Sequence, residues 1–300
     1  MGCSLSPVCA LVNATLAVPR TPRRARNPER RAPRITERDG FILEALAKMR
    51  FLETLQLARL AFDGSRWAAR KRLRKLLDAG VVRVWVRDLA RDNVYSLTRG
   101  GAARLASDSE IAWPVPRGLD GNLDHLLAIN EVRISLALSL EEVGGEIRWW
   151  RSDWELRAPA RGHIVPDALF ALGWVGMGHL ETFALEVDNA TRSPRRFLGK
   201  LLKYGALRVR GRALYGAQDF LLLVVGRDER WVERYRQALA RLRLGLFVFF
   251  ATLPGVGREG AAGSIWRPAG GEETYSLQSL ASLPYGKEGT AEESKGISEC

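Results

Sequence analysis

The chain has 300 residues, of which 46% are hydrophobic and 27% are charged, and its net charge is +12. This is the composition of a globular protein long enough for two domains of roughly 100 to 150 residues each. The three cysteines, Cys3, Cys9 and Cys300, lie at the extreme termini, where they predict neither a disulfide-bonded core nor a zinc site. No apolar run approaches the roughly 20 residues that span a bilayer, and no secretory signal is recognisable, so we expect a cytoplasmic protein without membrane contact.

The positive charge is concentrated in the N-terminal third of the chain. Residues 20–34 contain seven Arg and one Glu, and residues 35–104 contain fifteen Lys or Arg against eight Asp or Glu. The rest of the chain therefore has a net charge close to zero. Because neutralisation of phosphates supplies much of the affinity for nucleic acid, this asymmetry predicts a polyanionic partner for the N-terminal third.

Three helices are predicted in succession after a disordered basic arm over residues 1–34. Thr36 and Asp39 have the spacing of a capping box at the start of the first helix. Thr54 is the predicted N-cap of a short second helix. Ser65 caps a third helix, which stops at Gly80.

A hairpin follows the three helices. Residues 81–86 and 94–97 are β-branched or alternating and are separated by a polar turn, and residues 102–106 suggest a further short helix. Three helices and a hairpin of these lengths predict a winged helix-turn-helix over residues 35–106. In that motif the third helix lies in the major groove of double-stranded DNA.

The third helix contains most of the residues predicted to contact DNA. Ala69, Leu73 and Leu76, with the side that runs from Trp67 to Leu77, form its predicted apolar stripe. Basic residues step by four along another face, where like charges repel weakly unless an external anion offsets the cost. A solvated basic face without a partner is the alternative. The predicted contacts are Arg66, Arg70, Lys71, Arg74 and Lys75 on the helix, with Arg83 and Arg87 on the hairpin.

The second half of the chain predicts a separate α/β domain. Residues 107–122 form a linker, and residues 123–255 alternate in the order helix, three strands, helix, strand, helix, strand, which describes a mixed sheet with helices packed against it. Trp149, Trp150 and Trp154 are interpreted as core and edge packing rather than as base-stacking residues. Residues 256–300 are predicted to be an irregular to disordered tail.

Carboxylates at the strand ends of this domain are candidates for catalysis. Asp167 opens one predicted strand, and Glu186 and Asp188 close the next. Such carboxylates could bind Mg²⁺ and activate water against a phosphodiester, with Lys200 and Lys203 on the next helix polarising the phosphate. The alternative is structural, in which the carboxylates pair with Arg192, Arg195 and Arg196.

Taken together, these motifs resemble the replication-relaxation family of plasmid and mobile-element proteins. The resemblance runs from about residue 35 to 251. It is carried by the segments ITERD (35–39), FL (51–52), LARLAF (57–62), RLRKL (72–76) with Gly80, YSLT (95–98) with GA (101–102), HLLAIN (125–130), PDALF (166–170), EVD (186–188) and KLLKY (200–204).

The resemblance implies a winged helix followed by a domain similar to the PD-(D/E)XK nuclease fold. It also implies DNA binding in the replication control or mobilisation of a plasmid, with replication or mobilisation proteins as further partners and a homodimer left open. By position, Asp167 and Glu186 match the motif's first Asp and its Glu, whereas Asp188 replaces the motif's Lys. Two hypotheses follow from this match: a nuclease-like domain kept as a binding scaffold, and a Mg²⁺-dependent endonuclease or nickase whose lysine is supplied by Lys200 or Lys203.

Overall fold

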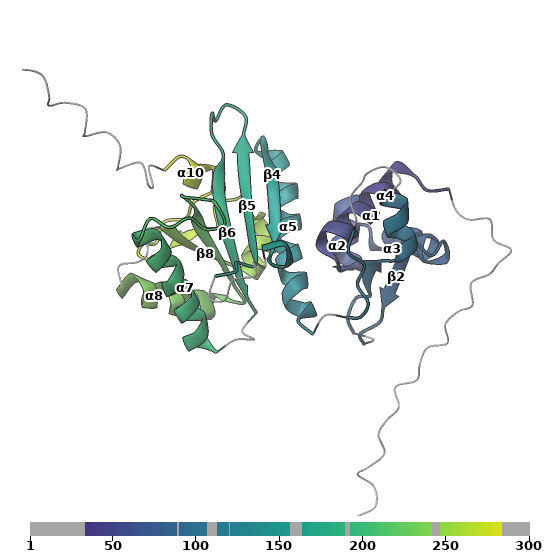
Figure 1. Ribbon diagram of the computed structural model, residues 1–300, viewed down its shortest axis with the longest axis horizontal. Helices are drawn as coiled ribbons and strands as arrows, with labels where there is room; N and C mark the ends of the chain where they lie inside the picture. Colours follow the sequence, from purple (N-terminus) through teal and green to yellow (C-terminus); the bar gives the residue numbers. More distant parts are fainter. Residues whose placement is uncertain are drawn as a thin grey trace, which may run out of the picture.

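The computed structural model describes residues 34–88, 90–106, 113–119, 121–156, 164–189, 193–241 and 247–283. The chain is mixed α/β, as predicted, with a three-stranded sheet in its N-terminal part and a six-stranded sheet in its C-terminal part (Figure 1). Nearly all of the arm predicted over residues 1–34 lies outside the described residues, as does the end of the predicted tail from residue 284.

The N-terminal unit follows the predicted order of helices and hairpin. Its elements are α1 (Glu37–Met49), β1 (Leu52–Glu53), α2 (Thr54–Ala61), α3 (Arg66–Asp78), β2 (Val82–Trp85), β3 (Val94–Leu97) and α4 (Arg99–Ala106). The short strand β1 was not expected, and it pairs antiparallel with β3, which also pairs antiparallel with β2. The three helices enclose a core in which Ile42, Leu46 and Leu73 are completely buried.

Helix caps explain where these helices begin. The capping box of Thr36 and Asp39 is present, and the Ser65 hydroxyl accepts a hydrogen bond from the backbone N–H of Ala68. The cap predicted for α2 is wrong by one residue. Glu53 is the N-cap and forms a reciprocal pair with Gln56, while the backbone N–H of Thr54 bonds across to the β3 side of the hairpin.

The C-terminal unit is built on a sheet with the strand order β4-β5-β6-β7-β8-β9. The β4–β5, β5–β6 and β8–β9 pairs are antiparallel, whereas β6–β7 and β7–β8 are parallel and are connected through helices. Its elements are α5 (Leu123–Glu142), β4 (Gly145–Ser152), α6 (Asp153–Leu156), β5 (Ala168–Trp174), β6 (Glu181–Asp188), α7 (Pro194–Val209), β7 (Leu221–Gly226), α8 (Glu229–Arg241), β8 (Val248–Thr252), α9 (Leu253–Glu259), β9 (Arg267–Pro268) and α10 (Leu277–Ala281). Helices α7 and α8 cover one face of the sheet, and α5 lies on the other (Figure 1).

The C-terminal segment differs from the expected irregular tail. Residues 253–281 contain α9, β9 and α10, and Trp266 is completely buried in the core of the sheet. The Trp266 indole N–H donates to the backbone carbonyl of Ala261, so the polar atom of this large side chain is satisfied inside the core. The elements of this segment are short and rich in Gly, which hides the periodicity of the buried positions, so the sequence alone predicts an irregular tail.

Helix α5 belongs to both units. Ile134 is completely buried in the core of the N-terminal unit, whereas Val132 and Leu136 are buried in the core of the sheet. The buried Asn130 amide donates to the carbonyls of Met49 and Phe51, 3.1 and 2.8 Å away. These contacts hold the N-terminal unit against the sheet. None of the helices in the described ranges has the length and apolar character needed to cross a membrane.

Candidate nucleic-acid interface and buried carboxylate cluster

Helix α3 separates its buried and exposed residues cleanly. Ala69, Leu73 and Leu76 are completely buried and dock the helix onto the N-terminal core. Arg72 also faces inward, where its guanidinium pairs with both carboxylate oxygens of the buried Asp39. This pairing outweighs the effect of burial and lowers the pKa of Asp39 below its usual value.

The opposite side of α3 presents a row of cations to solvent. It contains Arg66, Arg70, Lys71, Arg74 and Lys75, all of them exposed. Arg66 and Arg70 share one carboxylate, that of Asp92, at 3.3 and 3.4 Å. These two bonds are long, and the three arginine side chains of the row remain 47–61% exposed. The helix therefore carries more positive charge on this face than its neighbours neutralise.

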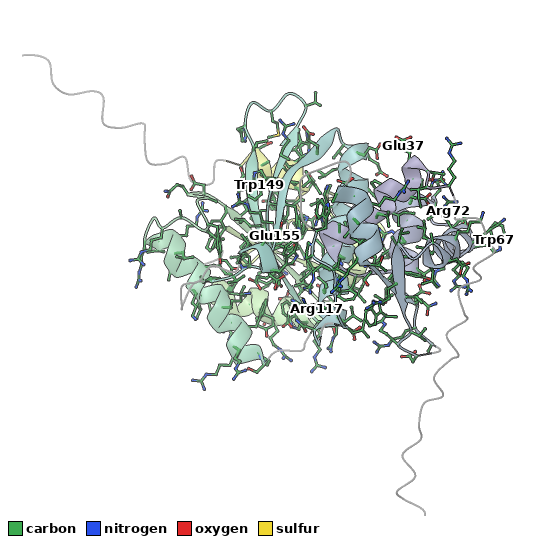
Figure 2. The ribbon with its side chains drawn as sticks, turned by 45° about the vertical axis from the view of Figure 1, so that its right-hand side comes forward. Glu37, Trp67, Arg72, Arg117, Trp149 and Glu155 are labelled. Atoms are coloured by element: carbon green, nitrogen blue, oxygen red, sulfur yellow. The ribbon has the colours of Figure 1, made fainter. Side chains whose placement is uncertain are left out.

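Trp67 lies on this basic face and is 72% exposed. The prediction that its side chain belongs to the apolar stripe is therefore wrong. Its ring stacks beneath Lys71, whose ammonium nitrogen is 4.8 Å from the ring centroid. Figure 2 places Trp67 at the end of the molecule that points away from the large sheet. The spacing in the sequence does indicate that Trp67 lies on the basic face. Trp67, Lys71 and Arg74 are separated by four and three residues and so share one side of a helix.

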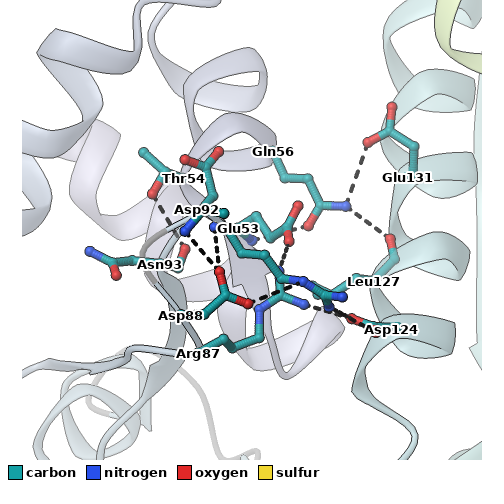
Figure 3. Close-up of polar contacts among 12 residues, drawn as sticks. Glu53, Thr54, Gln56, Arg87, Asp88, Asp92, Asn93, Asp124, Leu127 and Glu131 are labelled. Atoms are coloured by element: carbon teal, nitrogen blue, oxygen red, sulfur yellow. Dashed lines mark hydrogen bonds and ion pairs between the residues drawn. The ribbon is translucent and has the colours of Figure 1, made fainter. Parts of the chain in front are cut away.

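The two arginines predicted on the hairpin have different surroundings. Arg83 on β2 is exposed, and its guanidinium lies 5.2 Å from the centroid of the Trp85 ring. The Arg87 side chain is only 13% exposed and lies in an ion-pair cluster with Glu53 and Asp124 (Figure 3). Arg87 is therefore placed between the two units, and not on the exposed basic face with the residues of α3.

This ion-pair cluster connects the hairpin loop to the first turn of α5. Arg87 and Arg91 reach the Asp124 carboxylate at 2.6 and 3.1 Å. Nearby, Gln56 donates to the backbone carbonyl of Leu127 at 2.9 Å (Figure 3). The loop thus contacts the C-terminal unit through charged groups, whereas α3 projects away from it.

The carboxylates predicted from the strand ends lie together at one end of β5 and β6. Asp167 is buried, and its two oxygens accept hydrogen bonds from His125 Nε2, at 3.1 Å, and from the backbone N–H of Val187, at 2.8 Å. Burial alone would raise its pKa. The bond from His125 and the charges of His125 and Lys200 outweigh burial, so the pKa of Asp167 is lowered.

Glu186 is completely buried and faces α7. Lys200 Nζ lies 2.6 Å from its carboxylate, and the Tyr204 hydroxyl donates to it at 2.5 Å. Burial and the neighbouring charge of Asp167 raise the pKa of Glu186 to about 7, against the opposing effect of Lys200. Burial and the charge of Glu186 raise the pKa of Tyr204 well above its usual value. A buried, hydrogen-bonded cluster therefore joins the end of β6 to the middle of α7.

The remaining candidates lie apart from this pair. Asp188 is buried and accepts a hydrogen bond from the Trp231 indole on α8, at 3.1 Å. Lys203 is exposed on α7, so of the two lysines predicted there only Lys200 reaches a carboxylate. Arg195 and Arg196 are exposed as well, and Arg192 lies outside the described residues. The expected pairing with Arg195 and Arg196 is replaced by pairing with Lys200 and Tyr204.

The carboxylates as arranged do not fit a Mg²⁺ ion. Both oxygens of Asp167 and both oxygens of Glu186 already accept hydrogen bonds from protein donors, one of them an ammonium group. Magnesium takes oxygen ligands in octahedral geometry and retains several waters, which requires open space and unshared lone pairs. Within the described ranges, no group of three or more His, Cys, Asp or Glu side chains is arranged to hold a metal ion.

Two members of the cluster, His125 and Tyr204, were not predicted as site residues. His125 lies on α5, which places it beside Asp167 inside the C-terminal unit. Tyr204 follows Lys200 by one helical turn, so its position beside Lys200 on α7 is readable from spacing. The contact of Tyr204 with Glu186 on β6 cannot be read from spacing, because pairing between a helix and a strand depends on tertiary packing.

The family model for replication-relaxation matches residues 43–218. The chain belongs to the replication-relaxation family. The resemblance inferred from its motifs is therefore confirmed, and family membership indicates a DNA-related role. No curated protein matches the chain.

Two solved structures are similar over part of their length. The restriction endonuclease FokI matches with a TM-score of 0.31 and 10% identity, covering 76% of this chain and 45% of FokI. FokI bound to DNA matches with a TM-score of 0.29 and 13% identity, covering 74% of this chain and 44% of FokI. The chain thus spans less than half of the length of FokI, and TM-scores of this size do not establish a shared fold.

Proposed function

We propose that this replication-relaxation protein binds double-stranded DNA through a winged helix-turn-helix at residues 35–106, with α3 as the reading helix. In this proposal β2 and β3 are the wing, and residues 123–255 form a second domain of nuclease-like architecture. The site of action is a plasmid or mobile element, where replication or mobilisation proteins are the further partners. A homodimer on a palindromic site is compatible with the same reading helix.

The exposed basic face of α3 is the observation that carries this proposal. A helix with five cations on one side, and with Asp92 and Asp78 as their nearby counter-charges, repels itself in the absence of an anion. A DNA backbone supplies phosphates at regular spacing, and release of its counterions adds to affinity. Arginines on such a helix can also bind the O6 and N7 atoms of guanine in the major groove.

Trp67 adds an apolar element to the proposed reading surface. It follows the N-cap Ser65 by two residues, and the N-terminal residues of a reading helix are those that contact base edges. A ring that is 72% exposed between cations leaves a large apolar surface in water. Contact with thymine methyl groups or with deoxyribose would bury that surface.

A salt series tests the proposed phosphate contacts. Arg70→Ala combined with Arg74→Ala is expected to weaken binding to duplex DNA and to lower the slope of log affinity against log salt by about two, or about one per lost contact. The measurement is fluorescence anisotropy of labelled plasmid-derived duplexes. Unchanged affinity and slope would contradict the proposal.

A matched double variant controls for net charge. Arg241 and Arg258 are exposed at the last turns of α8 and α9, away from α3. Arg241→Ala with Arg258→Ala removes the same charge and is expected to leave the slope close to that of the unmodified protein. A slope reduced equally by both pairs would indicate attraction by net charge alone.

The second candidate function is a Mg²⁺-dependent endonuclease or nickase addressed by the same winged helix. The contact between Lys200 and Glu186 favours it, because Lys200 brings a lysine to the carboxylates in place of the one that Asp188 replaces. This function requires Asp167 and Glu186 to exchange their present donors for metal. The test is incubation of supercoiled plasmid with the protein and Mg²⁺ or Mn²⁺, in which DNA binding alone predicts no nicking.

Substitutions separate true nicking from contamination. Nicking that is lost in Asp167→Asn, Glu186→Gln and Lys200→Met, each shown to be folded, would establish the endonuclease. Nicking that survives all three substitutions would come from another protein.

A further inference from the structure

An aromatic groove lies where α1 meets β4, α5 and α6. It has a volume of about 490 Å³ and opens to solvent. Four of the nine tryptophans of the chain line it: Trp113, Trp149, Trp150 and Trp154. Trp149 is 36% exposed, and Figure 2 places it with Glu155 on the part of the molecule opposite Trp67. The groove and the basic face of α3 are therefore separate surfaces.

The walls of the groove contain hydrogen-bond donors that have no acceptor among the described residues. The Arg133 guanidinium lies over the Trp150 ring, 4.9 Å from its centroid, and makes no ion pair or hydrogen bond with any described residue. Burial lowers the pKa of Arg133 to about 10, with only the charge of Glu155 acting in the opposite direction. The indole N–H of Trp113 is also buried without an acceptor among the described residues. A buried donor such as this indole N–H is costly unless a ligand supplies an acceptor.

The two carboxylates that line the groove are already engaged. Glu44 pairs with Lys48 at 2.5 Å, and Glu155 accepts a hydrogen bond from the backbone N–H of Ser152 at 2.7 Å. They offset part of the positive charge, but neither one bonds to Arg133. Among the described residues of the groove, Arg133 is therefore a cation that lies beside aromatic rings without a paired carboxylate.

The outer surface of β4 extends the same chemistry. This strand forms the edge of the large sheet and carries the sequence Arg148-Trp149-Trp150-Arg151. Arg148 and Arg151 are exposed, and the Arg151 guanidinium lies 5.8 Å from the centroid of the Trp149 ring. Indole rings interleaved with arginines are the combination with which proteins hold unpaired nucleotides, the rings stacking on bases and the cations following the phosphates.

We propose that this groove binds an unpaired nucleotide of single-stranded DNA, with its base stacked on Trp149 and its phosphate beside Arg133. The volume lies within the range of sites for small ligands and holds one nucleotide, while the open β4 surface accommodates its neighbours. Duplex DNA does not fit this role, because its bases are stacked on one another and are not free to enter the groove. The chain thus has a single-strand site in addition to the proposed duplex site.

The test compares single-stranded and duplex DNA on the full chain. The probe is a fluorescently labelled 20-nucleotide oligothymidylate, which forms no duplex, and binding is followed by anisotropy. Trp149→Ala is expected to weaken its binding by on the order of tenfold and to leave duplex affinity within about twofold. Val175→Ala is the control, since it removes an apolar side chain that is 90% exposed beyond β5 and belongs to neither proposed DNA surface, and it is expected to leave oligothymidylate binding unchanged.

A second variant tests the cation. Arg133→Met keeps the length and packing of the side chain while removing its charge, and it is expected to weaken oligothymidylate binding with a lower salt slope; urea unfolding of each variant shows that the fold is retained. No binding of oligothymidylate by the unmodified protein, or equal weakening by Trp149→Ala and Val175→Ala, would overturn the proposal. Duplex binding through α3 would stand in either case, so the two proposals fail separately.

Discussion

The exposed face of α3 and the carboxylate cluster between β6 and α7 both gather charged side chains, but they neutralise them differently. On α3, arginines that are 47–61% exposed pair with Asp92 and Asp78 at 3.2–3.4 Å. In the cluster, the carboxylate of Glu186 is completely buried and receives an ammonium and a hydroxyl at 2.6 and 2.5 Å. The face of α3 therefore leaves positive charge available to an external partner, whereas the charges of the buried cluster are neutralised by partners inside the fold.

This comparison separates the charges that stabilise the protein from those available for binding. Removal of a buried charge that has close partners leaves those partners unsatisfied and destabilises the fold. Removal of an exposed charge costs little stability and alters binding instead. Each charged residue can therefore be assigned to one class by two measurements, the free energy of unfolding and the salt dependence of DNA binding.

The largest expected effect is on stability, at Glu186. Glu186→Ala leaves the Lys200 ammonium and the Tyr204 hydroxyl without their acceptor in a buried site, and we expect a loss of about 3–5 kcal/mol in the free energy of unfolding, measured by urea denaturation. Glu186→Gln retains an acceptor and is expected to lose clearly less. Glu146→Ala is the exposed control, with an expected loss below about 1 kcal/mol. Equal losses in all three variants would contradict the comparison.

A pH dependence of stability is the next largest effect. The folded-state pKa of Glu186, about 7, lies above the usual value of 4.5, so the folded protein binds this proton more tightly than the unfolded chain. The stabilisation is fully present below pH 4.5 and is lost as the pH rises through about 7. We expect the contribution of Glu186 to fall by about 3 kcal/mol between pH 4.5 and pH 8.

Glu186→Gln isolates this contribution, because glutamine does not titrate. The difference in unfolding free energy between the unmodified protein and Glu186→Gln is expected to change over this pH range. Asp167 does not confound the measurement, since its lowered pKa places its own stabilisation above pH 3.8, to be lost only at lower pH. A difference that is constant from pH 4.5 to pH 8 would show that Glu186 does not titrate in this window.

The smallest of these effects concerns Arg87, an arginine of the N-terminal unit whose side chain is mostly shielded from solvent. Arg87→Ala removes its ion pairs with Glu53 and Asp124, and we expect a loss of about 1–2 kcal/mol in the free energy of unfolding. Its side chain is only 13% exposed, so the salt slope of duplex binding is expected to remain unchanged. A slope lower by about one would instead place Arg87 on the DNA interface.

Local signals in the sequence predicted where α1 and α3 begin and where α3 ends. The caps at Thr36 and Ser65 and the stop at Gly80, where φ is +74°, are determined by residues within a few positions of each other. Trp67 was misplaced because an aromatic residue near apolar neighbours is normally part of a core. Only its offset from Lys71 and Arg74 indicates the exposed face.

The candidate cluster was predicted only in part. Asp167 and Glu186 were identified from their positions at strand ends, but their partners come from α5 and α7. The contact between Glu186 and Lys200 joins residues on different elements, and its geometry depends on how α7 packs on the sheet. The same limit applies to Arg87, because Asp124 reaches it only through the docking of α5 against the hairpin loop.

Site-specific photo-crosslinking tests the central claim most directly. A photoreactive amino acid at position 67 places the probe on the exposed face of α3, and one at position 175 places it at Val175, which is 90% exposed beyond β5. With duplex DNA that the protein binds, the account predicts a covalent protein–DNA adduct from position 67 and none above background from position 175. Absence of an adduct at position 67, or equal yields at the two positions, would contradict the assignment of α3 as the DNA-reading helix.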